Sequence, residues 1–279
     1  MIVRILFIGD IVGRPGRDLV QNGLHSLVEH YDIDCTVANA ENSAAGFGIT
    51  RDIGETLLDW GIDVMTSGNH IWDKKEVLEY IPGEPRLLRP ANFPAGVPGR
   101  GSCVAQTRDG RSVGVINLMG RVFMAPLDDP FAVALREIDA VRHRARIIVV
   151  DVHAEATSEK IAMGWHLDGR VTAVIGTHTH VQTADERILP GGTAYLTDAG
   201  MTGPHDSIIG MEKEPSLSRF LNGMPAKFEP AAGNPRLNGA VIEADDKTGR
   251  ATKITRISYS AHDLDELAVR SAVRGTTGA

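Results

Sequence analysis

The sequence has few cysteines and no long apolar run, and these two shortages exclude whole classes of protein. Cys35 and Cys103 are the only cysteines among 279 residues, and they form neither a CxxC pair nor a dense framework. This excludes a disulfide-rich scaffold and favours a reducing compartment. No stretch approaches the roughly 20 apolar residues that cross a bilayer, and the N-terminal run is too short for a signal peptide. We therefore expect a cytoplasmic protein with no membrane partner.

Positive charge and aromatic side chains are also scarce. The chain has 29 Lys and Arg against 36 Asp and Glu, a net charge of −7, and only 5% aromatic residues. A general nucleic-acid-binding protein would carry a basic surface with aromatic side chains between the charges, so RNA is expected only as a substrate. A phosphorylated substrate would need local positive charge, which bound metal ions would supply.

The remaining composition is that of an ordinary globular protein, with 42% hydrophobic and 23% charged residues. This length suits one large α/β domain or two small ones. The sequence contains no internal repeat and no low-complexity segment, so we predict a single domain over residues 1–279. We also expect a homo-oligomer.

Strands and helices are predicted to alternate along most of the chain. Helical spacing predicts helices over 17–30, 50–60, 73–80, 131–143 and 157–166, with Thr50 as an N-cap. Two antiparallel pairs are predicted, 103–107 with 112–118 and 238–244 with 251–260, and residues 198–213 are predicted to form a loop. This alternation predicts a layered α/β fold.

Polar side chains follow several apolar runs, at the point where each run ends. The runs lack alternation, which is typical of strands in a parallel sheet covered on both faces. Ligands bind outside the carboxyl ends of such strands, so we expect these side chains to converge in space. They are Asp10, Glu41, Asn42, Asn69, His153, His178 and His180.

Carboxylates, amides and imidazoles together suit a pair of divalent ions about 3.5–4 Å apart. Glu41 is the natural bridge between the ions. Asp10, Asn42 and His180 are assigned to one ion, and Asn69, His153 and His178 to the other. Mixed nitrogen and oxygen ligands favour iron or manganese, with zinc or cobalt as alternatives, over magnesium or calcium.

At these positions the chain resembles the calcineurin-like metallophosphoesterases, and within them the YmdB-like branch of bacterial phosphodiesterases. Val12 stands where the superfamily places a ligand histidine, and Glu41 replaces the usual bridging aspartate. The YmdB-like branch has these same changes, with Asn42 in place of the missing histidine. The matching stretches are Gly9-Asp10-Ile11-Val12, Asn39-Ala40-Glu41-Asn42, Gly68-Asn69-His70, His153, and His178-Thr179-His180 after Gly176.

The resemblance implies a four-layer α/β/β/α sandwich with two mixed sheets flanked by helices. It also implies hydrolysis of a phosphodiester, with 2',3'- or 3',5'-cyclic nucleotides as the leading substrates, by attack of a hydroxide that bridges two metal ions. His70 would be the acid that protonates the leaving oxygen, because histidine exchanges protons near neutral pH. Ile71 replaces the acid that usually follows Gly-Asn-His, which leaves open the partner that orients His70.

Several alternatives compete with this interpretation. A phosphomonoesterase of nucleotides or phosphoproteins would use the same ligands, and a non-catalytic regulator would use them to sense metal or nucleotide. Glycines at 9, 13 and 16 suggest a phosphate loop, but they do not match GxGxxG and no Gly-Lys-Ser/Thr follows. His153-Ala154-Glu155 resembles a deaminase zinc motif, but Pro-Cys-x-x-Cys is absent from the sequence.

Overall fold

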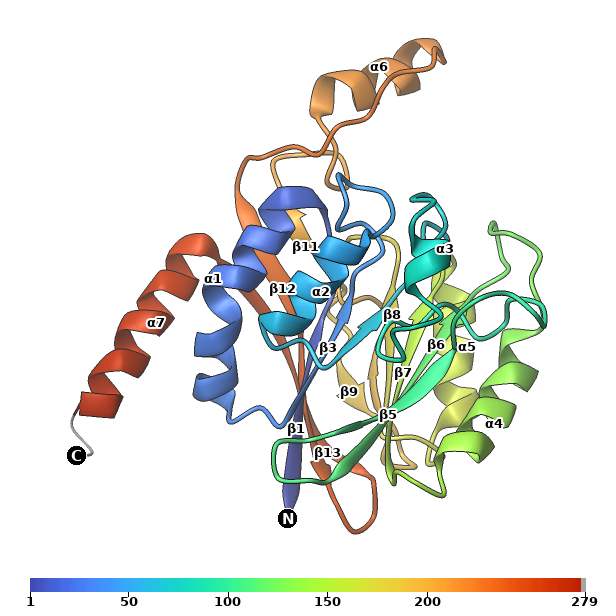
Figure 1. Cartoon of the computed structure of the whole chain (residues 1–279), viewed down its shortest axis with the longest axis vertical. Coiled ribbons are helices and arrows are strands. Elements are labelled where there is room, and N and C mark those ends of the chain that lie inside the picture. Colours follow the sequence, from blue (N-terminus) through green and yellow to red (C-terminus); the bar gives the residue numbers. More distant parts are fainter. Residues whose placement is uncertain (277–279) are drawn as a thin grey trace.

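The computed structural model describes residues 1–276. Figure 1 shows strands in the centre of the molecule, with helices on either side and α6 projecting from one end. The helices are α1 (Gly13–Tyr31), α2 (Arg51–Asp59), α3 (Val77–Tyr80), α4 (Pro130–Val141), α5 (Thr157–Leu167), α6 (Lys213–Asn222) and α7 (Ala261–Thr276).

Within residues 1–276 the strands form two sheets. The first has seven strands in the order β2-β11-β12-β1-β3-β4, and β13 also pairs with β12. Strands β1, β3 and β4 run parallel, whereas β12 is antiparallel to β1 and to β13. The sheet is therefore mixed. Its strands are β1 (Ile2–Ile8), β2 (Asp10–Ile11), β3 (Cys35–Asn39), β4 (Val64–Thr66), β11 (Met201–Pro204), β12 (Pro235–Asp245) and β13 (Ala251–Ser260).

The second sheet, also mixed, has six strands in the order β5-β6-β7-β8-β10-β9. Strands β6, β7, β8 and β10 are parallel, and the edge strands β5 and β9 are antiparallel to their neighbours. Its strands are β5 (Ser102–Gln106), β6 (Ser112–Met119), β7 (Ile147–His153), β8 (Ala173–Thr177), β9 (Arg187–Ile188) and β10 (Ala194–Leu196).

Both faces of the central strands are buried, which explains why their sequences show no alternation. In β1, Phe7 packs with residues of the second sheet such as Val149, whereas Leu6 and Ile8 pack with residues of α1 and α2. Adjacent strand residues point to opposite faces, so a strand covered on both sides needs apolar residues at every position. A further core cluster joins the second sheet to α4 and α5.

The predicted mixed α/β architecture is confirmed, with two mixed sheets and accompanying helices. The expected N-cap is also present, because the Thr50 side chain accepts a hydrogen bond from Ile53 N. The helix expected over 73–80 is shorter than predicted, since only Val77–Tyr80 is helical. Among residues 1–276, no helix combines the length and the apolar character needed to span a bilayer.

The prediction of a loop over 198–213 is wrong in part. Met201–Pro204 forms strand β11, which pairs with β2 and β12. This strand contains a glycine and a proline, so it lacks the local signal of a strand and is formed through its long-range pairing. Helix α6 then begins at Lys213, where no helix was predicted.

Candidate metal centre

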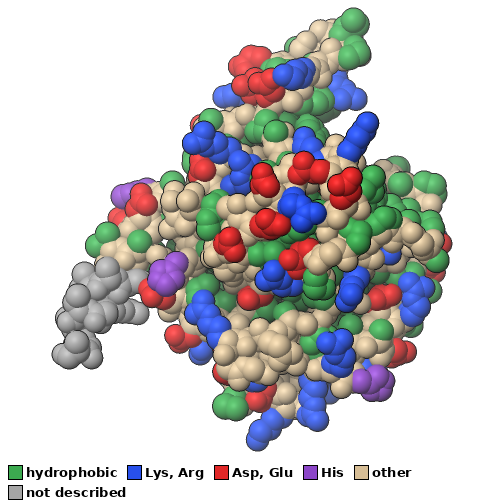
Figure 2. All heavy atoms as spheres, in the orientation of Figure 1, with side chains coloured by type: hydrophobic (Ala, Val, Ile, Leu, Met, Phe, Trp, Pro, Cys, Tyr) green, Lys and Arg blue, Asp and Glu red, His purple; other side chains and the backbone are tan. Residues whose placement is uncertain are grey.

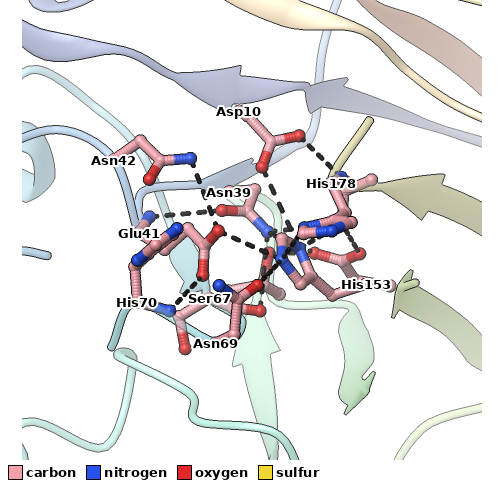
Figure 3. A network of polar contacts seen from close by, with 12 residues as sticks. Asp10, Asn39, Glu41, Asn42, Ser67, Asn69, His70, His153 and His178 are labelled. Carbon is pink, nitrogen blue, oxygen red and sulfur yellow. Dashed lines mark hydrogen bonds and ion pairs between the residues drawn. The ribbon is translucent and has the colours of Figure 1, made fainter. Parts of the chain in front are cut away.

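The imidazole of His153 lies at the centre of one group of predicted ligands. Its Nε2 atom is 3.0 Å from Glu41 Oε1, 3.0 Å from Asn69 Oδ1 and 3.0 Å from His178 Nδ1. Glu41, Asn69 and His178 follow β3, β4 and β8, and His153 is the last residue of β7. Figure 3 shows their side chains pointing toward one another. The predicted strand ends therefore meet in one place.

A hydrogen-bond relay behind His153 sets which of its nitrogens faces this group. The Thr177 hydroxyl donates to Asp151 Oδ1 at 2.7 Å, so it accepts from His153 Nδ1 at 2.9 Å. Asn39 Nδ2 also donates to Asp151, at 3.2 Å. Because Thr177 engages Nδ1, Nε2 is the His153 nitrogen that faces the other predicted ligands, as in a metal-binding histidine.

The second group of predicted ligands lies around Asp10. The His180 Nε2 atom is 3.9 Å from Asp10 Oδ1 and 3.1 Å from Asn42 Nδ2. His180 Nδ1 donates to the Ile209 carbonyl at 2.8 Å, which again leaves Nε2 to face the other predicted ligands. This group therefore repeats the imidazole arrangement found at His153.

Glu41 lies between the two groups. Its Oε1 atom contacts His153 Nε2 at 3.0 Å and accepts from Asn42 Nδ2 at 3.4 Å. Its Oε2 atom accepts from the backbone N–H of His70 at 3.0 Å. A carboxylate with contacts on both sides has the placement that a bridging ligand needs.

Burial and the neighbouring charges shift the pKa values of these groups in different directions. Burial raises the pKa of Asp10. It acts in the same direction on Glu41, but the attraction of His153 outweighs it and the pKa of Glu41 falls to about 2. Conversely, Glu41 and Asp10 raise the pKa of His153 to about 9 against the effect of burial. Burial and repulsion from His153 lower the pKa of His178 to about 3.

The donor set fits a metal ion better than it fits hydrogen bonding alone. The acceptor oxygens of Glu41 and Asn69 both lie 3.0 Å from His153 Nε2, and a single proton on that nitrogen can serve only one of them well. Asp10 Oδ1 is fully buried and has no hydrogen-bond partner, which is costly for a carboxylate. The ligand atoms of Glu41, His153 and His178 lie within 4.8 Å of one another. A bound cation would satisfy all of these groups.

His70 lies beside this cluster and is oriented by an acid that the sequence alone did not assign. The Nδ1 atom of His70 is 2.8 Å from Asp73 Oδ2, and the Phe47 ring packs edge-on at 5.1 Å between ring centroids. Because Asp73 engages Nδ1, the Nε2 atom is the one left to donate a proton.

The loop that carries His178 and His180 has an unusual backbone. Both residues have positive φ angles, +97° and +65°, which cost roughly 1–3 kcal/mol each in a residue other than glycine. Asp198 holds the intervening Thr179 by accepting from its N–H and its hydroxyl. The buried ammonium of Lys160 lies 2.6 Å from Asp198 Oδ2. Through Asp198, this ion pair holds the strained loop between His178 and His180 in place.

Gly68 permits the close approach of β4 to His153. A Cβ atom on Gly68 would lie 2.0 Å from His153 Cδ2. Any side chain at this position would therefore displace the imidazole or the backbone that carries Asn69.

Comparison with known proteins identifies the family to which this chain belongs. The family model described as YmdB-like protein matches residues 6–257. The chain belongs to the YmdB-like family. It is 52% identical over 255 residues to a 2',3'-cyclic-nucleotide 2'-phosphodiesterase of Bacillus subtilis strain 168, covering 91% of this chain and 96% of the relative. It is also 36% identical over 268 residues to a putative phosphatase/phosphodiesterase of Mycoplasma pneumoniae, covering 94% of each chain.

Two solved structures share the fold of this YmdB-like chain. A hypothetical protein from Thermus thermophilus superposes with a TM-score of 0.85 at 42% identity, covering 92% of this chain and 99% of the other. A phosphatase from Mycoplasma pneumoniae superposes with a TM-score of 0.87 at 34% identity, covering 95% of this chain and 97% of the other.

The predicted ligands of this YmdB-like chain lie together in the structure, but the sequence did not reveal the residues that support them. Asp151 is an acid inside the apolar strand β7, and Asn39 is an amide at the end of β3; these positions are a signal that could have found them. Asp73 occupies the third position after His70, in a turn whose geometry the sequence does not give. Lys160 lies in a helix where a lysine would ordinarily face solvent.

Proposed function

We propose that this chain is a metal-dependent phosphodiesterase that hydrolyses 2',3'-cyclic nucleotides at the 2' ester. The observation that carries the proposal is the convergence of Glu41, Asn69 and His178 on His153 Nε2, together with the buried Asp10 Oδ1 atom, which has no hydrogen-bond partner. The 52% identity to a 2',3'-cyclic-nucleotide 2'-phosphodiesterase supports the choice of substrate.

Asp10, Asn42 and His180 would hold one ion, Asn69, His153 and His178 the other, and Glu41 would bridge the two. We propose iron or manganese, with zinc or cobalt as alternatives, because the ligands mix nitrogen with oxygen. When bound, such ions lower the pKa of a coordinated water and offset negative charge on the phosphoryl oxygens.

The reaction adds the oxygen of water to phosphorus and breaks the bond between phosphorus and O2'. His70 Nε2 gives its proton to O2', and a proton released by the water returns to the solvent, from which His70 is reprotonated. The phosphoryl group remains on O3', so the product is a nucleoside 3'-phosphate. Asp73 holds the His70 ring through Nδ1 during this transfer.

The proposal is tested by comparing turnover of metal-loaded protein on a 2',3'-cyclic nucleotide, a 3',5'-cyclic nucleotide and a nucleoside 3'-phosphate, with product identification by chromatography. We expect the first to be cleaved fastest, to a 3'-phosphate. Faster release of inorganic phosphate from the monoester would instead favour a phosphomonoesterase. Binding of cyclic nucleotide with no hydrolysis above a Glu41→Ala control would favour a regulator.

We further propose the complete four-layer α/β/β/α sandwich as a single domain over residues 1–279, assembled as a homo-oligomer in the cytoplasm. The core clusters on both sides of the two sheets support the layering. The two free thiols support a reducing compartment. Light scattering of the purified protein would measure the oligomeric state.

A further inference from the structure

A pocket of about 510 Å³ opens directly beside the candidate metal centre, and its two walls differ in character. One wall consists of the predicted ligands and the proposed acid, namely Glu41, Asn42, His70, His178 and His180. The other wall is largely apolar and includes Phe47, Ile209, Met211, Phe220 and Phe228. This volume lies in the range of small-molecule sites, which is about 300–1,000 Å³.

The apolar wall is anchored in the protein. Phe47 and Phe228 are half-buried and pack against the buried residues Val12, Met201 and Met211 in a small hydrophobic cluster. The segment after β3 supplies Phe47, and the segment after α6 supplies Phe228.

Helix α6 completes this wall from the outside. The Arg219 guanidinium lies 5.5 Å from the centroid of the Phe228 ring. Figure 1 shows α6 projecting from the body, and Figure 2 shows hydrophobic side chains at the end of the projection. Phe220, which also lines the pocket, is 81% exposed.

The position of His70 decides on which side of the centre the nucleoside must lie. His70 lines this pocket, but it does not line the neighbouring pocket that shares His180 and Ile209. If His70 protonates O2', the ribose that carries O2' lies on the His70 side of the phosphate. The base attached to that ribose then lies against the apolar wall.

We propose that the apolar wall is a nucleobase subsite, in which Phe47 and Phe228 contact the faces of the base. This inference rests on the proposed function. The wall offers aromatic surface but few polar groups, chiefly Ser216 and Arg219. Every base has a π-face, so stacking of this kind tolerates all four bases. The subsite therefore requires a base and discriminates little among adenine, guanine, cytosine and uracil.

The experiment compares kcat/KM on the four 2',3'-cyclic nucleotides with kcat/KM on 1-O-methylribose 2,3-cyclic phosphate, which has no base. Wild-type protein should cleave the four nucleotides within about tenfold of one another, and the baseless ester at least about tenfold less efficiently, as expected for one stacked base. Phe228→Ala should lower kcat/KM on the nucleotides by about tenfold, mainly through KM, and leave the baseless ester unchanged.

Two further variants test whether the effect depends on an aromatic ring at position 228. Phe228→Trp keeps an aromatic face and should retain the preference for nucleotides. Trp165→Ala removes an aromatic ring that is also paired with an arginine, Arg187 at 5.5 Å, but lies outside the pocket, and it should change nothing.

Two results would contradict the inference in different ways. Equal efficiency of wild-type protein on nucleotides and on the baseless ester would overturn the subsite and leave the proposed function intact, as would an equal loss on both substrates in Phe228→Ala. Wild-type protein that cleaves no cyclic phosphate at all would overturn the proposed function, and the subsite with it.

Discussion

The buried ion pair between Lys160 and Asp198 supports the loop that carries His178 and His180, so replacing Lys160 should damage both stability and metal binding. Both side chains are 1% exposed, and Lys160 Nζ lies 2.6 Å from Asp198 Oδ2. In Lys160→Met the Asp198 carboxylate would remain buried without its cation.

The expected loss of stability depends on the hydrogen bonds that Asp198 keeps in the variant. Removing one partner of a buried ion pair costs about 3–5 kcal/mol, because the other charge is left uncompensated. Asp198 would still accept hydrogen bonds from Thr179 N, Thr179 Oγ1 and Gly200 N. We therefore expect a loss near the lower limit, about 3 kcal/mol in the free energy of unfolding. Loss of a support behind metal ligands typically weakens metal affinity by about 10–100-fold.

The assay is urea unfolding of metal-free wild-type protein, Lys160→Met, Asp198→Asn and the double variant, with metal affinity measured by competition against a chelating dye. The double variant removes both charges and should recover part of the loss, giving a coupling energy of about 1–3 kcal/mol. Lys253→Met replaces an exposed lysine paired with Glu243 and should change neither quantity. The reasoning would be refuted if the stability loss of the double variant equalled the sum of the two single losses and metal affinity were unchanged.

Three other predictions follow from the same site and core. His70→Ala should lower kcat by about 10²–10⁴-fold, the usual contribution of a general acid, with metal content retained; unchanged turnover would remove His70 from the mechanism. Glu41→Ala should lose bound metal, measured by mass spectrometry of the metal content, and full occupancy would exclude Glu41 as the bridge. Burial raises the pKa of Cys103 to about 12 and raises that of Cys35 well above its ordinary value. Neither thiol should therefore react quickly with a disulfide reagent at pH 8 until the protein is denatured, and prompt reaction of the folded protein would contradict these raised pKa values.

The parts of the fold that the sequence predicts are those with strong local signals. Unalternated apolar runs predict β1, β3 and β7 because both faces of these strands are buried, and helical spacing predicts α1 and α2. The convergence of the polar residues at the strand ends was predictable because the carboxyl ends of parallel strands meet at one edge of a sheet.

The parts that could not be predicted depend on contacts between distant segments. Strand β11 contains Gly203 and Pro204 and is stabilised by its pairing with β2 and β12. Asp73 orients His70 through a turn, and Lys160 is buried only because Asp198 and the carbonyl of Thr177 receive its ammonium group. Such partners become visible only once the chain is folded.

The central claim is that a pair of metal ions is held between Asp10, Glu41 and His153. Anomalous diffraction from crystals of metal-loaded protein tests this most directly, because it locates metal ions independently of activity. We predict two peaks about 3.5–4 Å apart, one on each side of the Glu41 carboxylate. Peaks located elsewhere on the protein, or a metal-loaded crystal with no peak beside Glu41, would contradict the account.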